Sequence, residues 1–410
     1  MKEATISVLG AGIQGCCLAL ALARRGHTVE LIDRHPLPMS ETSRHTEGKI
    51  HLGLVYAKDP RRATHRRMIR GSLAFADSLR EIAGLEPTRY ARGTRFHYVV
   101  PVESGLQPED IATHFQRVEA HTLEVQAETG ANYLGRRLDR VIRRFRDSEL
   151  REAYDPKTVQ AAFDSEEEAI DTLAMVSLLR DAVMDHPRIR FLGQTRVIDG
   201  VIESDGVRLV VEHADGRDER RYAAAANCLW AGRLALDSAL GIAPPRPWLF
   251  RFKAIIRLQA PELAASPIPS ATLVYGPFGD VVNYGNGEFY LSWYPSFKLG
   301  ETRDLDGTSL SNVLDTVDHQ QLARRGVEAM SRYIPGLQGL LEPRRDFQVG
   351  GGVIFSWGST DIDDPGSGLH ERWEIGPHRH GPYVSVDTGK YTMAPLFAVE
   401  TRRILEEILA

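Results

Sequence analysis

The sequence predicts an α/β protein, α+β overall, with two domains: one on a parallel sheet and one on an antiparallel sheet. Residues 5–33 follow the order strand, glycine turn, helix, strand, which gives a right-handed crossover between parallel strands. Residues 250–294 contain only strand patterns, and Asn286-Gly287 within them is typical of a tight hairpin turn. An antiparallel sheet in a chain that begins with parallel strands indicates a second domain. The expected boundaries are 1–90, 150–245 and 340–410 for the first, discontinuous domain, and 91–149 and 246–339 for the second.

The remaining elements follow from hydrophobic spacing and from capping residues. One helix is expected to be capped by Asp59 with Pro60 at its first position, and another to be capped by Asp171. Further helices are predicted at 13–25, 108–128 and from about 393 to the end. The predicted strands are 5–9, 28–32, 94–100, 188–192, 196–202, 207–212, 223–230, 250–258, 271–275, 280–284, 288–294 and 383–386.

Composition excludes several classes of protein. The 410 residues are 42% hydrophobic, which rules out wholesale disorder. A net charge of −5 leaves no basic surplus for nucleic-acid binding, and no apolar run is long enough for a membrane span. The apolar stretch near Met1 is broken by glycines and followed by Arg24-Arg25, unlike an export signal. Three cysteines form no disulfide framework, so we expect a cytoplasmic protein.

The first turn carries a dinucleotide-binding motif. Gly10-x-Gly12-x-x-Gly15 lies between a predicted strand and a predicted helix, the context that this motif requires. Gly10 allows the tight turn, Gly12 lets the backbone approach a pyrophosphate, and Gly15 lets the helix pack on the strand. Asp33 ends the second strand, where a carboxylate accepts hydrogen bonds from an adenosine ribose. The sequence therefore predicts a Rossmann-like domain that binds a dinucleotide.

The motif alone does not identify the dinucleotide. A carboxylate at Asp33 disfavours the 2′-phosphate of NADP, although the adjacent Arg34 leaves that cofactor possible. FAD and NAD use the same turn, so an NAD-dependent dehydrogenase is one alternative. Other segments of the chain must separate the two cofactors.

Three further segments, together with residues 10–33, resemble the FAD-dependent D-amino acid oxidase superfamily, whose members include enzymes that oxidise glycine, sarcosine and L-2-hydroxyglutarate. Residues 43–53 (SRHTEGKIHLG) are similar to the family's loop along the pyrophosphate and flavin. Residues 227–232 (NCLWAG) resemble a strand ending over the cofactor, and residues 381–395 resemble the C-terminal flavin loop and helix. Four such segments in the family's order favour FAD over NAD.

The resemblance implies a set of cofactor contacts. His45 occupies a position at which some relatives carry covalent flavin, but non-covalent members also have histidine there, so we expect non-covalent FAD. Independently of the family, a helix beginning near Met393 and the lysine at 390 would stabilise negative charge on reduced flavin. The predicted contacts are Gly10, Gly12, Ile13, Gln14, Gly15, Asp33, Arg34, Ser43, Arg44, His45, Gly48, Lys49, Val197, Ala231, Gly232, Gly389, Lys390, Tyr391 and Thr392.

The resemblance also suggests catalytic residues. Residues 290–300 are similar to a sarcosine-oxidase stretch in which a lysine helps oxygen react, which points to Lys298 near a wall containing Tyr290. The arginine that clamps a substrate carboxylate in amino-acid-oxidising members is missing, and Arg251 or Arg372 is a possible substitute. His51 falls at a position facing the flavin. His370, His378 and His380 fit no metal-ligand pattern, so no metal is expected.

The implied reaction is hydride transfer from a small-molecule substrate to FAD, with oxygen or an unidentified acceptor removing the electrons. The first hypothesis is a C–H bond next to an amine, in an amino acid or a secondary amine. The alternative is a hydroxy acid or other alcohol, which needs a base, and His51 is the best candidate. A flavin-bound scaffold without turnover is an alternative of another class.

Overall fold

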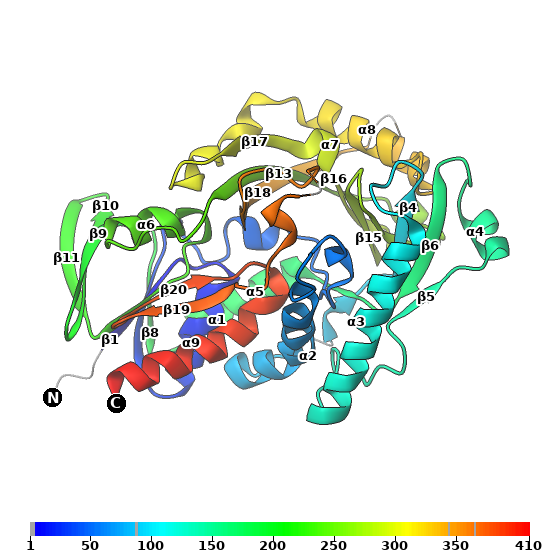
Figure 1. The fold of residues 1–410 in the computed structure, drawn as a ribbon. Helices are drawn as coiled ribbons and strands as arrows, with labels where there is room; N and C mark the ends of the chain where they lie inside the picture. Colours follow the sequence, from blue (N-terminus) through cyan, green and yellow to red (C-terminus); the bar gives the residue numbers. More distant parts are fainter. Residues whose placement is uncertain (1–4, 87–88, 343–344, 365) are drawn as a thin grey trace.

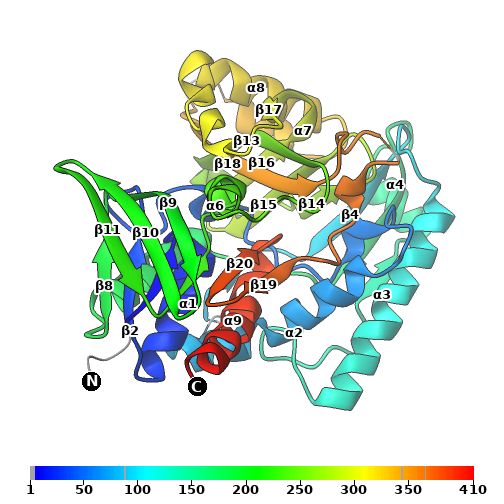
Figure 2. The ribbon, with the colours of Figure 1, turned by 60° about the vertical axis from the view of Figure 1, so that its left-hand side comes forward.

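The computed structural model describes residues 5–86, 89–342, 345–364 and 366–410. Two large sheets organise the described chain, and a small three-stranded sheet projects from one end (Figures 1 and 2). The prediction of a mixed α/β fold with a parallel and an antiparallel sheet is confirmed. No helix in these described stretches has both the length and the apolar character needed to cross a membrane.

The first sheet has the order β19-β20-β12-β1-β2-β8, with all neighbours parallel except β19 and β20. Its strands are β1 (Thr5–Leu9), β2 (Thr28–Ile32), β8 (Ile189–Leu192), β12 (Ala224–Asn227), β19 (Gly376–His380) and β20 (Tyr383–Asp387). Helix α1 (Ile13–Arg24) is buried along almost its whole length, because α9 (Ala394–Leu409), α5 (Thr172–Met184) and α2 (Thr64–Ala83) pack around it. A helix that is apolar on all sides is expected in such a position.

The second sheet has the order β17-β13-β16-β15-β14-β4-β6-β5, and β18 also pairs with β13. Most of its pairs are antiparallel, whereas β14 and β4 are parallel. Its strands are β4 (Phe96–Pro101), β5 (Ile142–Arg144), β6 (Val159–Ser165), β13 (Trp248–Gln259), β14 (Ser270–Leu273), β15 (Gly279–Gly285), β16 (Glu288–Trp293), β17 (Lys298–Thr302) and β18 (Gln348–Trp357). Around it lie α3 (Pro108–Thr129), α4 (Asp147–Ala153), α7 (Tyr294–Phe297) and α8 (His319–Met330).

The third sheet is formed by β9 (Arg196–Glu203), β10 (Gly206–His213) and β11 (Gly216–Tyr222) and leads through β12 to α6 (Arg233–Ala239). Its apolar face packs on the first sheet, since Val207, Leu209 and Val211 share a buried cluster with residues of β1, β12 and β20. Short 3-10 turns connect the elements, and a two-stranded ribbon pairs β3 (Ala91–Arg92) with β7 (Ala169–Ile170). The turns that matter below are η1 (Thr42–Arg44), η4 (Trp230–Gly232), η6 (Gly307–Leu310), η9 (Gly368–His370) and η10 (Tyr391–Met393).

Eight strands were absent from the sequence prediction: β3, β5, β6, β7, β11, β17, β18 and β19. β11 reads GRDERRY and therefore lacks the apolar alternation that marks a strand. β18 contains three consecutive glycines after Val349, which resemble a turn, and β19 contains polar and charged residues without an apolar pattern. β6 and β18 both pair in the second sheet, although the predicted boundaries put their residues in the first domain. Those boundaries therefore place these two strands wrongly, and the division into two domains stays a prediction.

Both predicted capping residues bind backbone N–H groups, but one predicted helix start is wrong. Asp171 caps α5 as expected, since its carboxylate accepts the N–H groups of Leu173 and Ala174. The Asp59 carboxylate also accepts backbone N–H groups, but α2 begins at Thr64 rather than at Pro60. The hairpin prediction is supported by positive φ angles of 52° at Asn286 and 77° at Gly287.

Candidate cofactor and substrate cavity

A cavity of about 650 Å³ lies between the carboxyl ends of the parallel strands and the second sheet. Its wall includes the turn after β1, the segment 33–56, the start of β9, the residues after β12 and parts of β13 to β18. Open parallel sheets bind ligands at this edge because the strands end there and the helices begin. The volume is in the range of sites for organic ligands.

The glycine turn is packed too tightly for side chains. Gly10 has a φ of 92°, and a Cβ there would lie 2.7 Å from the carbonyl oxygen of Cys228. A Cβ on Gly15 would lie 1.7 Å from the Gly10 oxygen, so the helix packs directly on the turn. The Ile13 N–H donates to Ser43 Oγ at 3.0 Å, which ties the turn to the segment 43–53.

Asp33 lies where the motif predicts it, at the edge of the cavity. Its carboxylate accepts the N–H groups of Ala11 at 2.6 Å and His35 at 2.8 Å. Burial raises the pKa of Asp33, and these two hydrogen bonds oppose that effect. A carboxylate has about four acceptor positions, so acceptor capacity remains for a ligand hydroxyl. The neighbouring Arg34 is paired with Glu41, which compensates its charge.

Several polar atoms at the cavity have no partner in the described protein. Gln14 Nε2, His51 Nδ1, Tyr56 Oη and Tyr391 Oη are buried and unpaired, and all four residues line the cavity. Buried polar atoms normally find partners, because an unpaired one costs about 1–3 kcal/mol. These atoms fit a ligand that carries many hydrogen-bonding groups, as FAD does.

Residues from the second and fourth resembling segments meet beneath the cavity. Thr392 Oγ1 accepts the His51 N–H at 3.1 Å and donates to the Lys49 oxygen at 3.3 Å. Lys49 Nζ lies 3.2 Å from Asp280 Oδ1 and above the rings of Phe96 and Tyr98. Lys49 therefore links the cofactor loop to the second sheet.

His51 and Glu47 form a buried polar pair at the cavity. His51 Nε2 lies 3.2 Å from Glu47 Oε1. Burial, helped by the charge of Lys390, lowers the pKa of His51 to about 3, so its ring is neutral at pH 7. Burial opposes ionisation of Glu47, but the His51 hydrogen bond and the Lys390 charge outweigh it and lower the Glu47 pKa. The pair is thus a neutral imidazole beside an ionised carboxylate.

Lys298 does not line the cavity, contrary to the prediction. After β16 the chain turns through α7, and Lys298 begins β17 with its ammonium 2.5 Å from Asp361 and 3.1 Å from Glu301. Tyr290 does line the cavity, as predicted, and so does Lys253 of β13, which the sequence prediction missed. The sequence contained a signal for this residue, because Arg251 and Lys253 alternate with apolar residues in the first half of β13.

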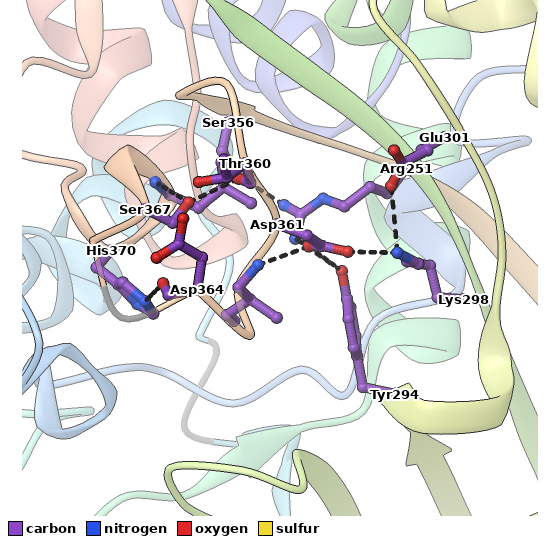
Figure 3. A network of polar contacts seen from close by, with 12 residues as sticks. Arg251, Tyr294, Lys298, Glu301, Ser356, Thr360, Asp361, Asp364, Ser367 and His370 are labelled. Atoms are coloured by element: carbon purple, nitrogen blue, oxygen red, sulfur yellow. Dashed lines mark hydrogen bonds and ion pairs between the residues drawn. The ribbon is translucent and has the colours of Figure 1, made fainter. Parts of the chain in front are cut away.

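Both arginines suggested as carboxylate clamps line the cavity. Arg372 donates to the carbonyl oxygens of Phe355 at 3.2 Å and Gly389 at 2.9 Å, and to Ser356 Oγ at 2.6 Å. Within the described stretches, Arg372 makes no ion pair with a carboxylate. Arg251 differs, because its guanidinium lies 3.0 Å from Asp361 (Figure 3).

The predicted cofactor contacts divide into two groups. The first group lines the cavity: Gly10, Gly12, Ile13, Gln14, Asp33, Arg34, Ser43, His45, Gly48, Lys49, Val197, Ala231, Gly232, Gly389, Lys390 and Tyr391. Gly15, Arg44 and Thr392 lie outside the lining, the first because it packs the helix and the last because it bonds to His51. His370 also lines the cavity, whereas His378 and His380 lie on β19. Over the described ranges, no cluster of three or more metal-ligating side chains is found.

Comparisons with known proteins agree with this geometry. Residues 5–367 match the DAO family, described as FAD dependent oxidoreductase. Glycine oxidase from Geobacillus kaustophilus superposes with a TM-score of 0.66 at 12% identity, over 98% of this chain and 95% of that one. L-alpha-glycerophosphate oxidase from Mycoplasma pneumoniae gives 0.66 at 14% identity, over 99% and 95%.

Among curated proteins, kynurenine 3-monooxygenase from Myxococcus xanthus is 51% identical over 41 residues, which is 10% of this chain and only 9% of that protein. The family match, in contrast, covers most of the chain. FAD rather than NAD is therefore the cofactor. The chain belongs to the DAO family of FAD-dependent oxidoreductases.

Proposed function

We propose that this oxidoreductase oxidises the C–H bond next to the nitrogen of an amine that also carries a carboxylate, such as an amino acid or an N-substituted amino acid. Arg372 carries the proposal. Its guanidinium lines the cavity and donates only to neutral oxygens of Phe355, Ser356 and Gly389. A cation at the cavity wall without a carboxylate partner is well suited to hold a substrate anion.

The choice of amine over alcohol rests on His51. Bound FAD supplies the hydride acceptor, N5 of its flavin ring. Oxidation of an alcohol also needs a base for the hydroxyl proton, and a base with a pKa of about 3 takes protons poorly at pH 7. Oxidation of an amine needs only the neutral amine. The nearby positive charges of Arg372, Lys253 and Lys390 favour that neutral form.

Oxidation of a hydroxy acid is the second candidate function. Its specific support is the unpaired Nδ1 of His51, a free acceptor at the cavity when Nε2 holds the proton. The two candidates share the carboxylate site at Arg372 and differ in the group that loses the proton. A flavin-bound scaffold without turnover would oxidise neither an amine nor a hydroxy acid.

The deciding experiment compares matched substrates. Amino acids, their N-methyl forms and the hydroxy acids of the same carbon skeletons are mixed anaerobically with the FAD-loaded protein, and loss of visible flavin absorbance is followed. We expect reduction by amines and not by the matched hydroxy acids. The reverse pattern would establish the second candidate, and no reduction by any compound would favour the scaffold.

Substitution at Arg372 tests the carboxylate site. Removing one partner of a buried charge pair costs about 2 kcal/mol or more, so Arg372→Met should raise KM for a carboxylate substrate by roughly 30-fold or more. The matched control is Arg67→Met, because Arg67 lies outside the cavity lining, over the Phe397 ring and near Glu400. Equal KM values in both variants would contradict the proposal.

A further inference from the structure

Two guanidinium groups meet at one wall of the cavity. Arg251 comes from β13 and Arg372 from the segment after η9. Both donate to the same oxygen, Ser356 Oγ, at 2.9 Å from Arg251 and 2.6 Å from Arg372. Burial and the neighbouring charge of Arg251 lower the pKa of Arg372. Such a pair of cations would attract a ligand with two carboxylates unless one of the charges is compensated.

Asp361 compensates one of the two. Its Oδ1 accepts Arg251 Nη1 at 3.0 Å, the Tyr294 hydroxyl at 2.7 Å and the Ile362 N–H at 2.7 Å (Figure 3). Asp361 lies behind the wall, since Arg251, Tyr294 and Ile362 line the cavity and Asp361 does not. The carboxylate therefore neutralises Arg251 without contacting the ligand space.

Lys298 belongs to the same network and does not disturb this balance. Its ammonium lies 2.5 Å from Asp361 and 3.1 Å from Glu301. Arg251 and Lys298 therefore lie beside the carboxylates Asp361 and Glu301, and Glu301 also lies 3.7 Å from the exposed Arg303. Hydrogen bonds from Lys298, Tyr294 and the Ile362 N–H outweigh burial and lower the pKa of Asp361 to about 2, which keeps it ionised. Arg372 makes no ion pair with the carboxylates of this network.

Three lysines of the cavity share two nearby carboxylates, Asp280 and Glu47. Lys49 and Lys253 lie 3.2 and 3.9 Å from the two oxygens of Asp280. Lys390 interacts with the negative charge of Glu47 and belongs to a predicted cofactor segment. Lys253 lies on β13, two residues from Arg251, whereas Lys49 and Lys390 come from other segments.

We propose that Asp361 determines specificity for substrates with a single carboxylate. By neutralising Arg251 it leaves Arg372 as the anion site of this wall, so a second carboxylate would be buried beside the Arg251–Asp361 pair without a cation of its own. Burying an unpaired carboxylate is strongly unfavourable. Asp361 acts through Arg251 and is a positioning residue. The inference rests on the proposed carboxylate site at Arg372.

The test uses two probes of equal chain length, butyrate with one carboxylate and succinate with two. Binding to the oxidised, FAD-loaded protein is measured by the change in the visible flavin spectrum and by calorimetry, so no turnover is needed. Wild type should bind butyrate about tenfold more tightly than succinate. Asp361→Asn should abolish that preference by strengthening succinate binding about tenfold, because a charge-assisted pair forms with Arg251. Unchanged succinate affinity in Asp361→Asn would overturn the inference.

Control variants separate charge from loop disruption. Lys298→Met removes another partner of Asp361 but keeps the Asp361–Arg251 pair, so it should retain the butyrate preference. Arg251→Met should retain butyrate binding and Arg372→Met should lose it, which tests the inference even if Asp361→Asn does not fold. Equal losses of butyrate affinity in the two arginine variants would overturn the inference about Asp361, but not the proposed function. Failure of wild type to bind either probe would instead remove the carboxylate site on which the proposed function depends.

Discussion

The two ends of the cavity are built differently. At the end that contains Gly10 and Asp33, one strand-turn-helix-strand unit supplies the glycine turn and the carboxylate, and its backbone N–H groups bond to Asp33 and Ser43. At the other end, side chains from widely separated elements converge, including His51, Lys253 and Arg372. The first end depends on a local motif, whereas the second depends on how the two sheets are placed against each other.

The two ends also differ in charge. Arg34 at the first end is paired with Glu41, so its charge is compensated locally. At the second end Arg372 has no ion pair in the described chain, and burial lowers the pKa of both Lys253 and Lys390. Uncompensated buried charges destabilise a protein unless a ligand uses them, so the second end is where reaction and specificity are expected.

The largest expected effect lies at the first end. A Cβ on Gly15 would sit 1.7 Å from the Gly10 oxygen, so Gly15→Ala must push the helix away from the turn. We expect FAD affinity to fall at least about 10²-fold, from a cost near 3 kcal/mol for overpacking. Titration of the apoprotein with FAD, followed by flavin fluorescence, measures this change.

Gly26→Ala is the matched control for that variant. Gly26 has a φ of 94°, but a Cβ there meets no atom within 4 Å. The control should lose about 1–2 kcal/mol of stability through its backbone conformation and keep its FAD affinity. Wild-type affinity in Gly15→Ala would mean that the turn is not the cofactor-binding element, and the contrast between the two ends would fail.

A smaller effect is expected at the second end, with Lys253. The first electron transferred to oxygen gives superoxide, an anion that a nearby ammonium stabilises. Lys253 lines the cavity, and Asp280 at 3.9 Å offsets part of its charge. Lys253→Met should therefore slow reoxidation by air between about 10- and 100-fold while substrate-driven reduction changes little. Stopped-flow measurement of the two half-reactions separates these rates.

Lys298→Met provides the comparison, because this lysine was the sequence-based candidate and lies outside the cavity lining. Its reoxidation rate should equal that of wild type. Since burial lowers the pKa of Lys253, wild-type reoxidation should also slow with rising pH before an ordinary lysine would lose its proton, and Lys253→Met should lack that dependence. Slow reoxidation in Lys298→Met but not in Lys253→Met would mean that Lys298, and not Lys253, promotes the reaction with oxygen. Slow reoxidation in wild type would indicate another electron acceptor.

The sequence predicted the first end well for a physical reason. The glycines, the helix start and Asp33 lie within one short segment whose geometry is set by local backbone rules. The fold class also followed from local patterns, except where β11 and β19 lack apolar alternation. A strand without an apolar face is fixed by its neighbours in the sheet, which sequence spacing does not reveal.

The second end depends on contacts between residues far apart in the chain. Lys298 was predicted near the flavin from the similarity of residues 290–300 to a sarcosine-oxidase stretch, but α7 turns the chain and directs this lysine toward Asp361. Lys253 could have been suspected as a charge in an apolar strand, but its position at the cavity required the packing of β13. Arg372 was named only as one of two arginines, and the ion pair of Arg251 with Asp361 distinguishes them.

The smallest expected effect concerns His51 at the second end and the pH dependence of the free energy of unfolding. Burial lowers the pKa of His51 from its ordinary value to about 3, so the folded protein leaves this ring neutral while the unfolded chain protonates it below about pH 6.5. As the pH falls from 6.5 toward 3, the unfolded state gains a proton that the folded state does not, and His51 lowers the free energy of unfolding by up to about 1.4 kcal/mol per pH unit. His51→Gln should therefore lose less stability than wild type between pH 6.5 and 5 in guanidinium denaturation, whereas His319→Gln, a change at an exposed position of α8, should behave like wild type. Equal losses in His51→Gln and wild type would mean that His51 takes up a proton in the folded protein, which would restore it as a base and favour the hydroxy acid over the amine.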